Sequence, residues 1–396
     1  MKKILFVYTS MMLGGSTTSL LSLMNNLDPT KYQVDLQLQT NTGPLLDNIP
    51  KHINLLPEAQ KYSGRKGRVI RKIRFVLQGK AFKALFVNLK NKKKGLSSAV
   101  IVDFLAKSLS RKNKNHYDYA IGFLEGWSDS YLAYSVNADK KYAWLHSTFA
   151  NITKDPSSQL PWMKKVDKIV FVTDPCTEDF KKALPCMAEK AITIENITDS
   201  DIIRKRSEAV DKADAAYKRF SEADCFKIIT VCRITISVKG LDRIVNCAKK
   251  LKAEGVEFLW YIVGNGDDED TLKNMIEDAD VADCLIPVGV RFNPYVFIKE
   301  ADIMCMPSRY EGKPMVITES MILGVPPIVT EYLSAREQIN DGIDGMVVAN
   351  NDNSIVNAVF ECVRDNAKVR EMKAYLLSKE YGNRSYIKKI EEKLFE

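Results

Sequence analysis

The stretch ADIMCMPSRYEGKPMVITESMILGVPPIVT, residues 301–330, decides the fold. It begins with an apolar run of strand length, 302–306, followed by a polar loop over 307–313. Pro314 suits a helix start, where its missing N–H costs no hydrogen bond, and Gly324 is typical of the residue just after a helix. A second apolar run then follows two prolines. The order strand, loop, helix, strand predicts one repeat of a parallel α/β sheet.

Two carboxylates frame this unit. Glu311 lies in the predicted loop and Glu319 in the predicted helix, with Arg309 and Lys313 close by in sequence. In a parallel α/β sheet such a loop lies at the carboxyl ends of the strands, where ligands bind, and a helix N-terminus offers free N–H groups to an anion. Spacing alone favours the alternative of two solvated surface glutamates, because short motifs often match by accident.

Length and composition bound the domain count and the compartment. A chain of 396 residues with 45% apolar residues is long enough for two domains with separate cores. Residues 1–200 and 201–380 are the predicted domains, and 381–396 a helix expected to pack back on the first. No apolar run approaches the length of a membrane span, and the first residues are too strand-like for a signal peptide, so we expect a cytoplasmic protein.

Metal and disulfide chemistry receive no support from the residue pattern. The eight cysteines form no C-x-x-C pair and lie mostly in apolar runs, and the three histidines include no H-E-x-x-H motif. Two D-x-D patterns, at Asp199/Asp201 and Asp278/Asp280, fall in polar helix-end or linker sequence. We therefore expect neither a metal site nor a cofactor.

Charge is distributed unevenly along the chain. The net charge is +8, but residues 1–200 hold 30 basic and 17 acidic residues, whereas the remainder holds 28 and 33. Residues 59–102 contain thirteen basic residues and no acidic one, and 61–94 predicts a basic amphipathic helix. Such a segment fits an anionic membrane surface. A solvated charged face is the alternative, and nucleic acid is disfavoured because no nucleic-acid-binding motif accompanies the segment.

The first domain offers two candidate positions. The strand predicted at 2–9 leads into a loop containing Gly14 and Gly15 and then a helix, which is an anion site in principle and a tight turn otherwise. His146 ends the strand predicted at 141–145. A histidine there is usually structural, but the carboxyl end of a strand is also where a ligand would meet it.

The second domain offers a cationic loop. Arg233 and Lys239 lie between a predicted strand and a helix beginning at Leu241, an arrangement suited to a diphosphate. A following strand ends in Gly264-Asn265-Gly266, which lets backbone approach a ligand but lacks the third glycine of a dinucleotide fingerprint.

Several of these motifs occur in an order that resembles the C-terminal domain of family-4 glycosyltransferases. The matching residues are Arg233 and Lys239-Gly240 in CRITISVKGLDRIV, Gly264-Asn-Gly266, Val288-Gly289, Asn293-Pro-Tyr295, Ala301-Asp302, Ser308, Glu311-Gly312, and Glu319 with Gly324-Val-Pro326. The first domain is similar to the family more loosely, through Gly14-Gly15 and the segments LEGW and WLHS. The variant SRYEGKPMV looks like bacterial enzymes that build capsules, exopolysaccharides or wall polymers. The family often has Phe-Gly where this chain has Lys313-Pro314.

The resemblance implies an α/β protein of the GT-B fold, with two Rossmann-like doubly wound parallel-sheet domains facing across a cleft. It implies a retaining, metal-independent transfer from a nucleoside-diphosphate sugar, a UDP-sugar in particular, to a glycan or lipid-linked acceptor. Catalytic roles are implied for His146, Glu311, Arg233 and Lys239. Donor contacts are implied for Gly14, Gly15, Gly264, Asn265, Arg291, Lys313, Pro314, Met315, Val316 and Glu319, with Glu319 on the ribose hydroxyls.

Two other functions remain open on the sequence. One is a sugar-nucleotide epimerase of the same fold, which would act on a donor without an acceptor. The other is a non-catalytic partner that binds a sugar nucleotide within a polymer-assembly complex. Turnover of the donor alone, or donor binding without turnover, would distinguish these functions from glycosyl transfer.

Overall fold

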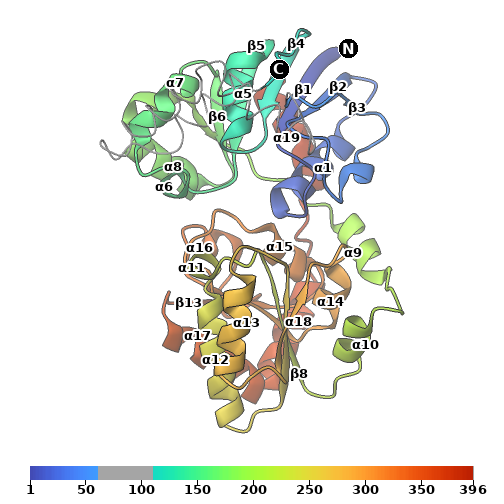
Figure 1. Ribbon diagram of the computed structural model, residues 1–396, viewed down its shortest axis with the longest axis vertical. Helices are drawn as coiled ribbons and strands as arrows, with labels where there is room; N and C mark the ends of the chain where they lie inside the picture. Colours follow the sequence, from blue (N-terminus) through green and yellow to red (C-terminus); the bar gives the residue numbers. More distant parts are fainter. Residues whose placement is uncertain (61–109, 396) are drawn as a thin grey trace, which may run out of the picture. The chain divides into compact units, whose positions relative to one another are not determined.

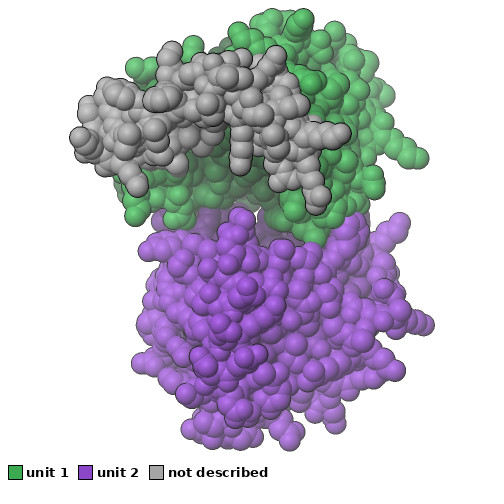
Figure 2. Space-filling model, viewed as in Figure 1, with its two compact units in different colours: residues 1–197, 385–396 green, residues 198–384 purple. Residues whose placement is uncertain are grey.

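The computed structural model describes residues 1–60 and 110–395 and divides the chain into two compact units (Figures 1 and 2). Unit 1 comprises Met1–Ile197 with Ser385–Glu396, and unit 2 comprises Thr198–Arg384. The chain therefore passes from one unit to the other twice. The predicted basic segment 61–94 lies outside the described residues.

Unit 1 is built on a seven-stranded parallel sheet with the order β3-β2-β1-β4-β5-β6-β7. Its strands are β1 (Lys2–Tyr8), β2 (Tyr32–Leu38), β3 (Asn54–Leu55), β4 (His116–Gly122), β5 (Asn137–Leu145), β6 (Lys168–Phe171) and β7 (Ala191–Thr193). Its α-helices are α1 (Gly15–Asn26), α5 (Trp127–Ser135), α6 (Phe149–Ile152), α7 (Leu160–Met163), α8 (Asp174–Ala183) and α19 (Ile387–Leu394).

Side-chain alternation along β1 builds a core on each face of this sheet. Ile4 and Phe6 join a buried cluster with residues of α1 and α19, whereas Leu5 and Val7 join a cluster with residues of α5, α7 and α8. A strand buried on both faces has to be apolar throughout, which accounts for the continuous run at the start of the chain. The C-terminal helix α19 belongs to this unit, and Tyr142 donates a 2.8 Å hydrogen bond to the carbonyl of Leu394.

Unit 2 holds a six-stranded parallel sheet with the order β10-β9-β8-β11-β12-β13. Its strands are β8 (Phe226–Val231), β9 (Phe258–Val263), β10 (Leu285–Gly289), β11 (Ile303–Met306), β12 (Pro327–Thr330) and β13 (Met346–Val348). Its α-helices are α9 (Ser200–Glu208), α10 (Ala215–Ser221), α11 (Ile236–Lys239), α12 (Leu241–Ala253), α13 (Glu269–Asp278), α14 (Tyr295–Glu300), α15 (Met315–Ile322), α16 (Ala335–Gln338), α17 (Asp352–Arg364) and α18 (Asn366–Leu377).

Helices cover both faces of the second sheet as well. The cluster on one face combines β8 residue Ile228 with α12, α13 and α17, and the cluster on the other combines Ile229 with α9, α14, α15 and α18. The predicted pair of Rossmann-like, doubly wound parallel sheets is therefore confirmed.

The decisive stretch folds as its local signals predict. Strand β11, helix α15 and strand β12 follow in order, and Pro314 is the residue immediately before the helix. Gly324 takes a left-handed φ of 75°, and its N–H donates to the Met321 carbonyl at 3.0 Å. A residue with a Cβ is strained in that conformation, so the glycine sets where the helix ends.

Candidate active site

The two sheets each reverse their strand order at one place. In unit 2 the reversal lies between β8 and β11, so the loops that follow these neighbouring strands meet at one edge of the sheet. Open parallel sheets bind ligands at this position because the two loops diverge and leave a crevice. The loops are 232–240 and 307–314, which contain the predicted cations and Glu311.

Lys239 and Glu311 form an ion pair across these loops. The Lys239 ammonium lies 2.6 Å from Glu311 Oε1, and the hydroxyl of Ser308 donates to the same oxygen at 2.7 Å. Their side chains are 20% and 10% exposed, so water screens the pair only partly. The structure thus brings one predicted cation and one predicted carboxylate into contact.

Gly240 allows this close approach of the two loops. Its φ is 68°, and a Cβ on this residue would overlap the carbonyl oxygen of Pro307. The buried guanidinium of Arg243 donates to the same carbonyl at 3.2 Å and to Asn350 Oδ1 at 2.6 Å. Arg243 of α12 therefore fixes the backbone at Pro307, in the loop that leads to Glu311.

The position of Arg309 in the sequence indicates a cation beside Glu311 and Glu319, but its side chain binds another carboxylate. Its guanidinium makes two hydrogen bonds to the Asp242 carboxylate, of 2.9 and 2.7 Å, and its backbone N–H donates to Val238 at 2.8 Å. Burial of Asp242 opposes ionisation, but the hydrogen bonds and charge of Arg309 outweigh it and lower the pKa of Asp242. Arg309 is thus a clamp between the two loops rather than a free cation.

Arg233 is the other cation of the loop after β8. It is exposed, and among the described residues no hydrogen bond or ion pair occupies its guanidinium. It therefore remains available to an anion near Lys239.

The N-terminus of α15 adds donors to this edge. The first residues of the helix, Met315 and Val316, have backbone N–H groups without a carbonyl in the preceding turn, which is the general condition of a helix start. Lys313, which precedes Pro314, lies 3.8 Å from Glu337. The Pro314 carbonyl accepts a 3.0 Å hydrogen bond from the Gln338 side chain, which anchors the entry to the helix.

Glu319 is buried one turn further along α15. It is 6% exposed, and Tyr295 of α14 donates to its Oε1 at 2.9 Å. Burial raises the pKa of Glu319 to about 7, while the Tyr295 hydrogen bond and the positive charge of Arg206 act in the opposite direction. The alternative of a solvated surface glutamate is therefore wrong for Glu319. Tyr295 belongs to the Asn293-Pro-Tyr295 motif, but the sequence predicts no role for its side chain, and Arg206 carries no signal in the sequence.

The glycines after β9 have a structural explanation. A Cβ on Gly264 would overlap the carbonyl of Cys232, and one on Gly266 would overlap that of Ile234. The Asn265 carbonyl accepts a 2.9 Å hydrogen bond from the Ile234 N–H. These glycines therefore permit close packing of backbone on the loop that carries Arg233, and the donor contacts predicted for Gly264 and Asn265 stay predictions.

Arg291 has contacts with an acidic and an aromatic residue of unit 2. Its Nε lies 3.1 Å from Asp214 at the start of α10, and its guanidinium carbon lies 5.8 Å from the centre of the Phe297 ring. The predicted donor contact of Arg291 stays a prediction.

In unit 1 the strand order reverses between β1 and β4, and the predicted residues follow β1 and β5. Gly14 is the cap of α1, Gly15 is its first residue, and the hydroxyl of Tyr8 lies 2.7 Å from that of Ser16. Burial and, to a smaller extent, the negative charge of Glu125 raise the pKa of Tyr8. The loop after β4, which contains Glu125, therefore lies near this turn.

His146 lies at the end of β5, tied to the loop after β4. Glu125 accepts hydrogen bonds from the His146 backbone N–H at 3.0 Å and from the Ser147 hydroxyl at 2.6 Å. The imidazole packs on Phe123, with ring centres 4.8 Å apart. Burial lowers the pKa of His146 to about 4, against smaller opposing effects of the Glu125 charge and the Phe123 carbonyl, so the ring is neutral at pH 7. Glu125 was part of the LEGW motif but had no assigned role.

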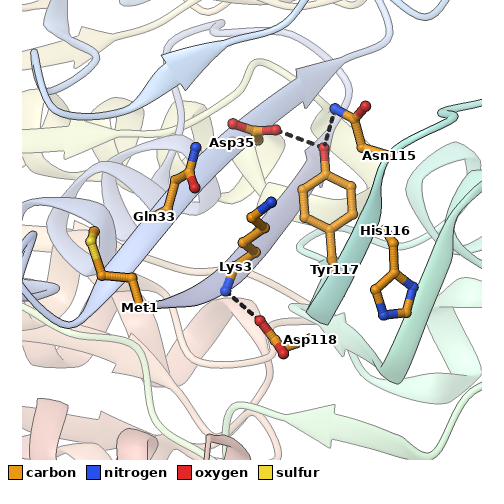
Figure 3. Close-up of a pocket in the computed structure, with 8 residues that line it drawn as sticks. All are labelled: Met1, Lys3, Gln33, Asp35, Asn115, His116, Tyr117 and Asp118. Carbon is orange, nitrogen blue, oxygen red and sulfur yellow. Dashed lines mark hydrogen bonds between the residues drawn. The ribbon is translucent and has the colours of Figure 1, made fainter.

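A pocket of about 520 Å³ in unit 1 lies at the opposite edge of the sheet (Figure 3). It is lined by the first residues of β1, β2 and β4, including Lys3, Gln33 and His116. Asp35 in its wall is already hydrogen-bonded to Tyr117 at 2.7 Å and to Asn54 at 2.9 Å. Since ligands of open parallel sheets bind at the carboxyl ends of the strands, we do not assign the donor to this pocket.

Metal-ligand clusters and membrane-spanning helices are both absent from the described residues. Residues 1–60 and 110–395 contain no group of three or more His, Cys, Asp or Glu side chains placed to hold a metal ion. Of the D-x-D residues, Asp199 caps α9 by accepting hydrogen bonds from the N–H groups of Asp201 and Ile202. In the same part of the chain, no helix is long and apolar enough to cross a membrane.

A family comparison identifies the domain that carries this edge. Residues 215–377 match the family model described as glycosyl transferases group 1. This part of the chain is a group 1 glycosyltransferase domain. It includes Arg233, Lys239, Glu311 and Glu319, and it begins after α9.

Curated relatives match over limited lengths. The amylovoran biosynthesis glycosyltransferase AmsK of Erwinia amylovora is 34% identical over 144 residues, covering 34% of this chain and 35% of AmsK. The putative colanic acid biosynthesis glycosyltransferase WcaL of Salmonella typhimurium is 31% identical over 134 residues, covering 32% and 33%. The matched part of the chain therefore spans about a third of the length of these relatives.

Solved structures match over nearly the whole chain. HepE of Anabaena, solved with UDP-glucose, superposes with a TM-score of 0.71 at 13% identity and 99% coverage of both chains. WaaG, described as a glycosyltransferase involved in lipopolysaccharide biosynthesis, superposes with a TM-score of 0.63 at 15% identity and 99% coverage of both. At these identities the similarity shows the fold, which is that of the GT-B glycosyltransferases.

Proposed function

We propose that the protein is a retaining glycosyltransferase that moves a sugar from a nucleoside-diphosphate sugar, a UDP-sugar in particular, to a glycan or lipid-linked acceptor. Bacterial surface polysaccharide synthesis is the proposed setting, supported by the names of the amylovoran and colanic acid relatives. UDP is supported as the nucleotide by the UDP-glucose complex of HepE.

One observation carries the proposal. Lys239, the exposed Arg233 and the N-terminus of α15 gather positive charge at the strand-order reversal of unit 2, and the Glu319 carboxylate lies on the same helix. A diphosphate with a ribose attached has the matching chemistry, since its phosphates accept hydrogen bonds and its hydroxyls donate them.

The reaction we propose needs no carboxylate nucleophile. The bond between the anomeric carbon and the diphosphate oxygen breaks, and the negative charge on the leaving diphosphate increases. Lys239, Arg233 and the N–H groups of α15 stabilise this charge more in the transition state than in the bound donor, which lowers the barrier. The acceptor hydroxyl attacks from the face that the diphosphate leaves, and its proton passes to the diphosphate oxygen. We include no metal or other cofactor.

Glu311 has a positioning role in this proposal. It holds the Lys239 ammonium at 2.6 Å and is itself held by Ser308. For His146, whose imidazole is neutral at pH 7, we propose a contact with the transferred sugar.

A donor screen followed by an assay tests this function. Thermal shift with several UDP-, GDP- and ADP-sugars identifies the donor, because a ligand that binds only the folded state raises its apparent stability. Release of nucleoside diphosphate is then measured with a panel of glycan and lipid-linked acceptors. We expect release that depends on an acceptor. Isomerisation of the donor alone would instead indicate an epimerase, and binding without turnover across the panel a non-catalytic partner.

A further inference from the structure

Helix α9 contributes a cation to the donor edge although it precedes the matched family domain. Arg206 lies near the end of α9, outside residues 215–377. Its guanidinium carbon lies 4.7 Å from the centre of the Tyr295 ring, over the face where a cation is attracted by the π-system. One of its nitrogens donates to the Phe292 carbonyl at 2.9 Å.

Further contacts hold Arg206 against Tyr295. Asn293 returns a hydrogen bond of 2.7 Å from its side-chain amide to the Arg206 carbonyl. Ile203, one turn earlier on α9, is buried in the same cluster as Tyr295 and Ile317 of α15. Arg206 is therefore fixed in position by packing and by two hydrogen bonds, which gives the Asn293-Pro-Tyr295 motif a physical reason.

Tyr295 links this cation to Glu319. Its hydroxyl donates to Glu319 Oε1 at 2.9 Å, and both side chains are buried. Burial disfavours a negative charge, so without these two partners Glu319 would hold its proton to a higher pH than it does beside them. A protonated carboxyl loses part of its capacity to accept hydrogen bonds, whereas the ionised form accepts at both oxygens.

We propose that Arg206 and Tyr295 are positioning residues that favour the ionised form of the Glu319 carboxylate and orient it, so that it accepts hydrogen bonds from the two ribose hydroxyls of the donor. The hydroxyl contact rests on the proposed function. Arg206 supplies the compensating charge and Tyr295 fixes the direction of the carboxylate. The donor site thus extends beyond the matched domain into α9.

The other elements packed against α15 leave this assignment intact. Helix α18 contacts α15, but its Lys373 is bound to the Ala301 carbonyl at 3.0 Å and to Asp302 at 3.2 Å. Strand β12 also contacts α15, and it contains no ionisable side chain. Among the described residues, Arg206 and Tyr295 are the only groups that shift the pKa of Glu319 besides burial.

The charge of Glu319 is tested first in the protein without ligand. The raised pKa makes the folded wild type lose thermal stability relative to Glu319→Gln as pH rises from about 4.5 to 7, because the folded state holds the proton longer. Arg206→Met and Tyr295→Phe each remove a group that lowers this pKa, so the loss is expected to extend to higher pH. When Glu319→Gln is added to either variant, this pH-dependent loss of thermal stability should disappear.

Two control variants match these changes. Arg204→Met removes an equal charge from α9 at a residue that pairs with Glu380 at 3.2 Å. Tyr217→Phe removes a tyrosine hydroxyl that donates to Glu300 at 3.0 Å in the same cluster. Identical pH dependence in each test variant and its control would overturn the proposal.

Binding of UDP and 2′-deoxy-UDP by calorimetry tests the hydroxyl contact. We expect Arg206→Met to weaken UDP binding about tenfold at pH 7. At pH 8.5 the variant should bind UDP nearly as tightly as the wild type. At pH 7 the variant should also lack the wild-type preference for UDP over 2′-deoxy-UDP. A preference unchanged by Arg206→Met would overturn the proposed contact. If the wild type binds no UDP, GDP or ADP, the proposed function fails and the hydroxyl contact with it, while the melting experiments still decide the ionisation of Glu319.

Discussion

The Lys239 ammonium and the Glu311 carboxylate lie 2.6 Å apart at the edge where the loops after β8 and β11 diverge. In the proposed reaction Lys239 stabilises the leaving diphosphate, and Glu311 holds the Lys239 ammonium in place. We expect Lys239→Met to lower transfer on the order of 10²–10³-fold, the cost of removing one preorganised donor. The rate of nucleoside diphosphate release at saturating donor and acceptor measures this.

Lys252→Met is the matched control for that change. Lys252 lies on α12 and pairs with Asp283 at 2.9 Å, and both side chains are solvent-exposed. Its replacement should leave transfer unchanged. Equal activity of the wild type and both variants would exclude Lys239 from the reaction.

Arg309 and Asp242 should matter for transfer although neither is proposed to contact the donor. Arg309→Lys keeps the charge but loses the paired hydrogen bonds to Asp242, so we expect the free energy of unfolding to fall by about 1–2 kcal/mol. The looser loop should also lower kcat, because Glu311 lies two residues away. Urea unfolding and steady-state kinetics measure the two effects.

Arg336→Lys provides the comparison for Arg309→Lys. Arg336 pairs with Glu331 at 2.7 Å, but its side chain is 59% exposed. Exposed pairs contribute little, so we expect a change within about 0.5 kcal/mol and unaltered kinetics. Equal effects of the two substitutions would show that the Arg309 clamp is only a surface contact.

Gly240 and Gly255 separate backbone strain from steric overlap. Both have a left-handed φ, of 68° and 71°, but a Cβ on Gly255 meets no atom within 4 Å, whereas one on Gly240 overlaps the Pro307 carbonyl. We expect Gly255→Ala to cost about 1–2 kcal/mol from strain alone. Gly240→Ala should cost about 1–3 kcal/mol more, because the loop before Glu311 has to move.

Chemical unfolding of both glycine variants measures these costs, and the transfer assay adds a second readout. Only Gly240→Ala is expected to reduce transfer, since only that change displaces the loop carrying Glu311. If the two variants lose the same stability, the close approach of Gly240 and Pro307 is not maintained in solution.

Local signals account for what the sequence predicted well. Apolar runs bounded by Gly and Pro located most strands, and Thr173 caps α8 as its position indicates, accepting a 3.2 Å hydrogen bond from the Cys176 N–H. Gly324 ends α15 where its backbone freedom is needed. Once strand order follows from a regular α/β repeat, Lys239 and Glu311 have to lie at one edge.

Partner choice between distant segments was not predictable in the same way. Arg309 turns to Asp242, Arg291 pairs with Asp214, and Arg206 lies over Tyr295, each from a different element. A guanidinium on a long side chain reaches many carboxylates, and only the packed fold decides which one it meets. Burial of Glu319 likewise depends on helices α9 and α14, which the sequence of α15 does not report.

Residues 61–94, which lie outside the described residues, predict binding to an anionic membrane from composition alone. Each basic residue near such a surface contributes about 1 kcal/mol, so replacing Lys92, Lys93 and Lys94 by Gln should lower partitioning on the order of 100-fold. Pelleting with phosphatidylglycerol vesicles at low salt measures this, and higher salt should release the wild type.

A second triple variant controls for net charge in the vesicle experiment. Lys388, Lys389 and Lys393 lie on α19, and replacing them by Gln removes the same charge elsewhere. We expect this variant to pellet like the wild type. Equal pelleting of the wild type with neutral and anionic vesicles would refute membrane binding through residues 61–94.

His146 should make the protein sensitive to acid. Burial holds the folded-state pKa at about 4, below the ordinary 6.5, so between these values the unfolded chain takes up a proton that the folded protein does not. The free energy of unfolding therefore falls as pH drops from about 6.5 through 4, by ~3 kcal/mol in total, and this contribution is absent above pH 7. His146→Gln removes the titration. We thus expect the stability difference between variant and wild type to shift by ~3 kcal/mol in favour of the variant between pH 7.5 and pH 4, measured by urea unfolding. A difference that stays constant over this range would mean that the imidazole is open to water, and its proposed contact with the sugar would then involve a ring that is partly charged near neutral pH.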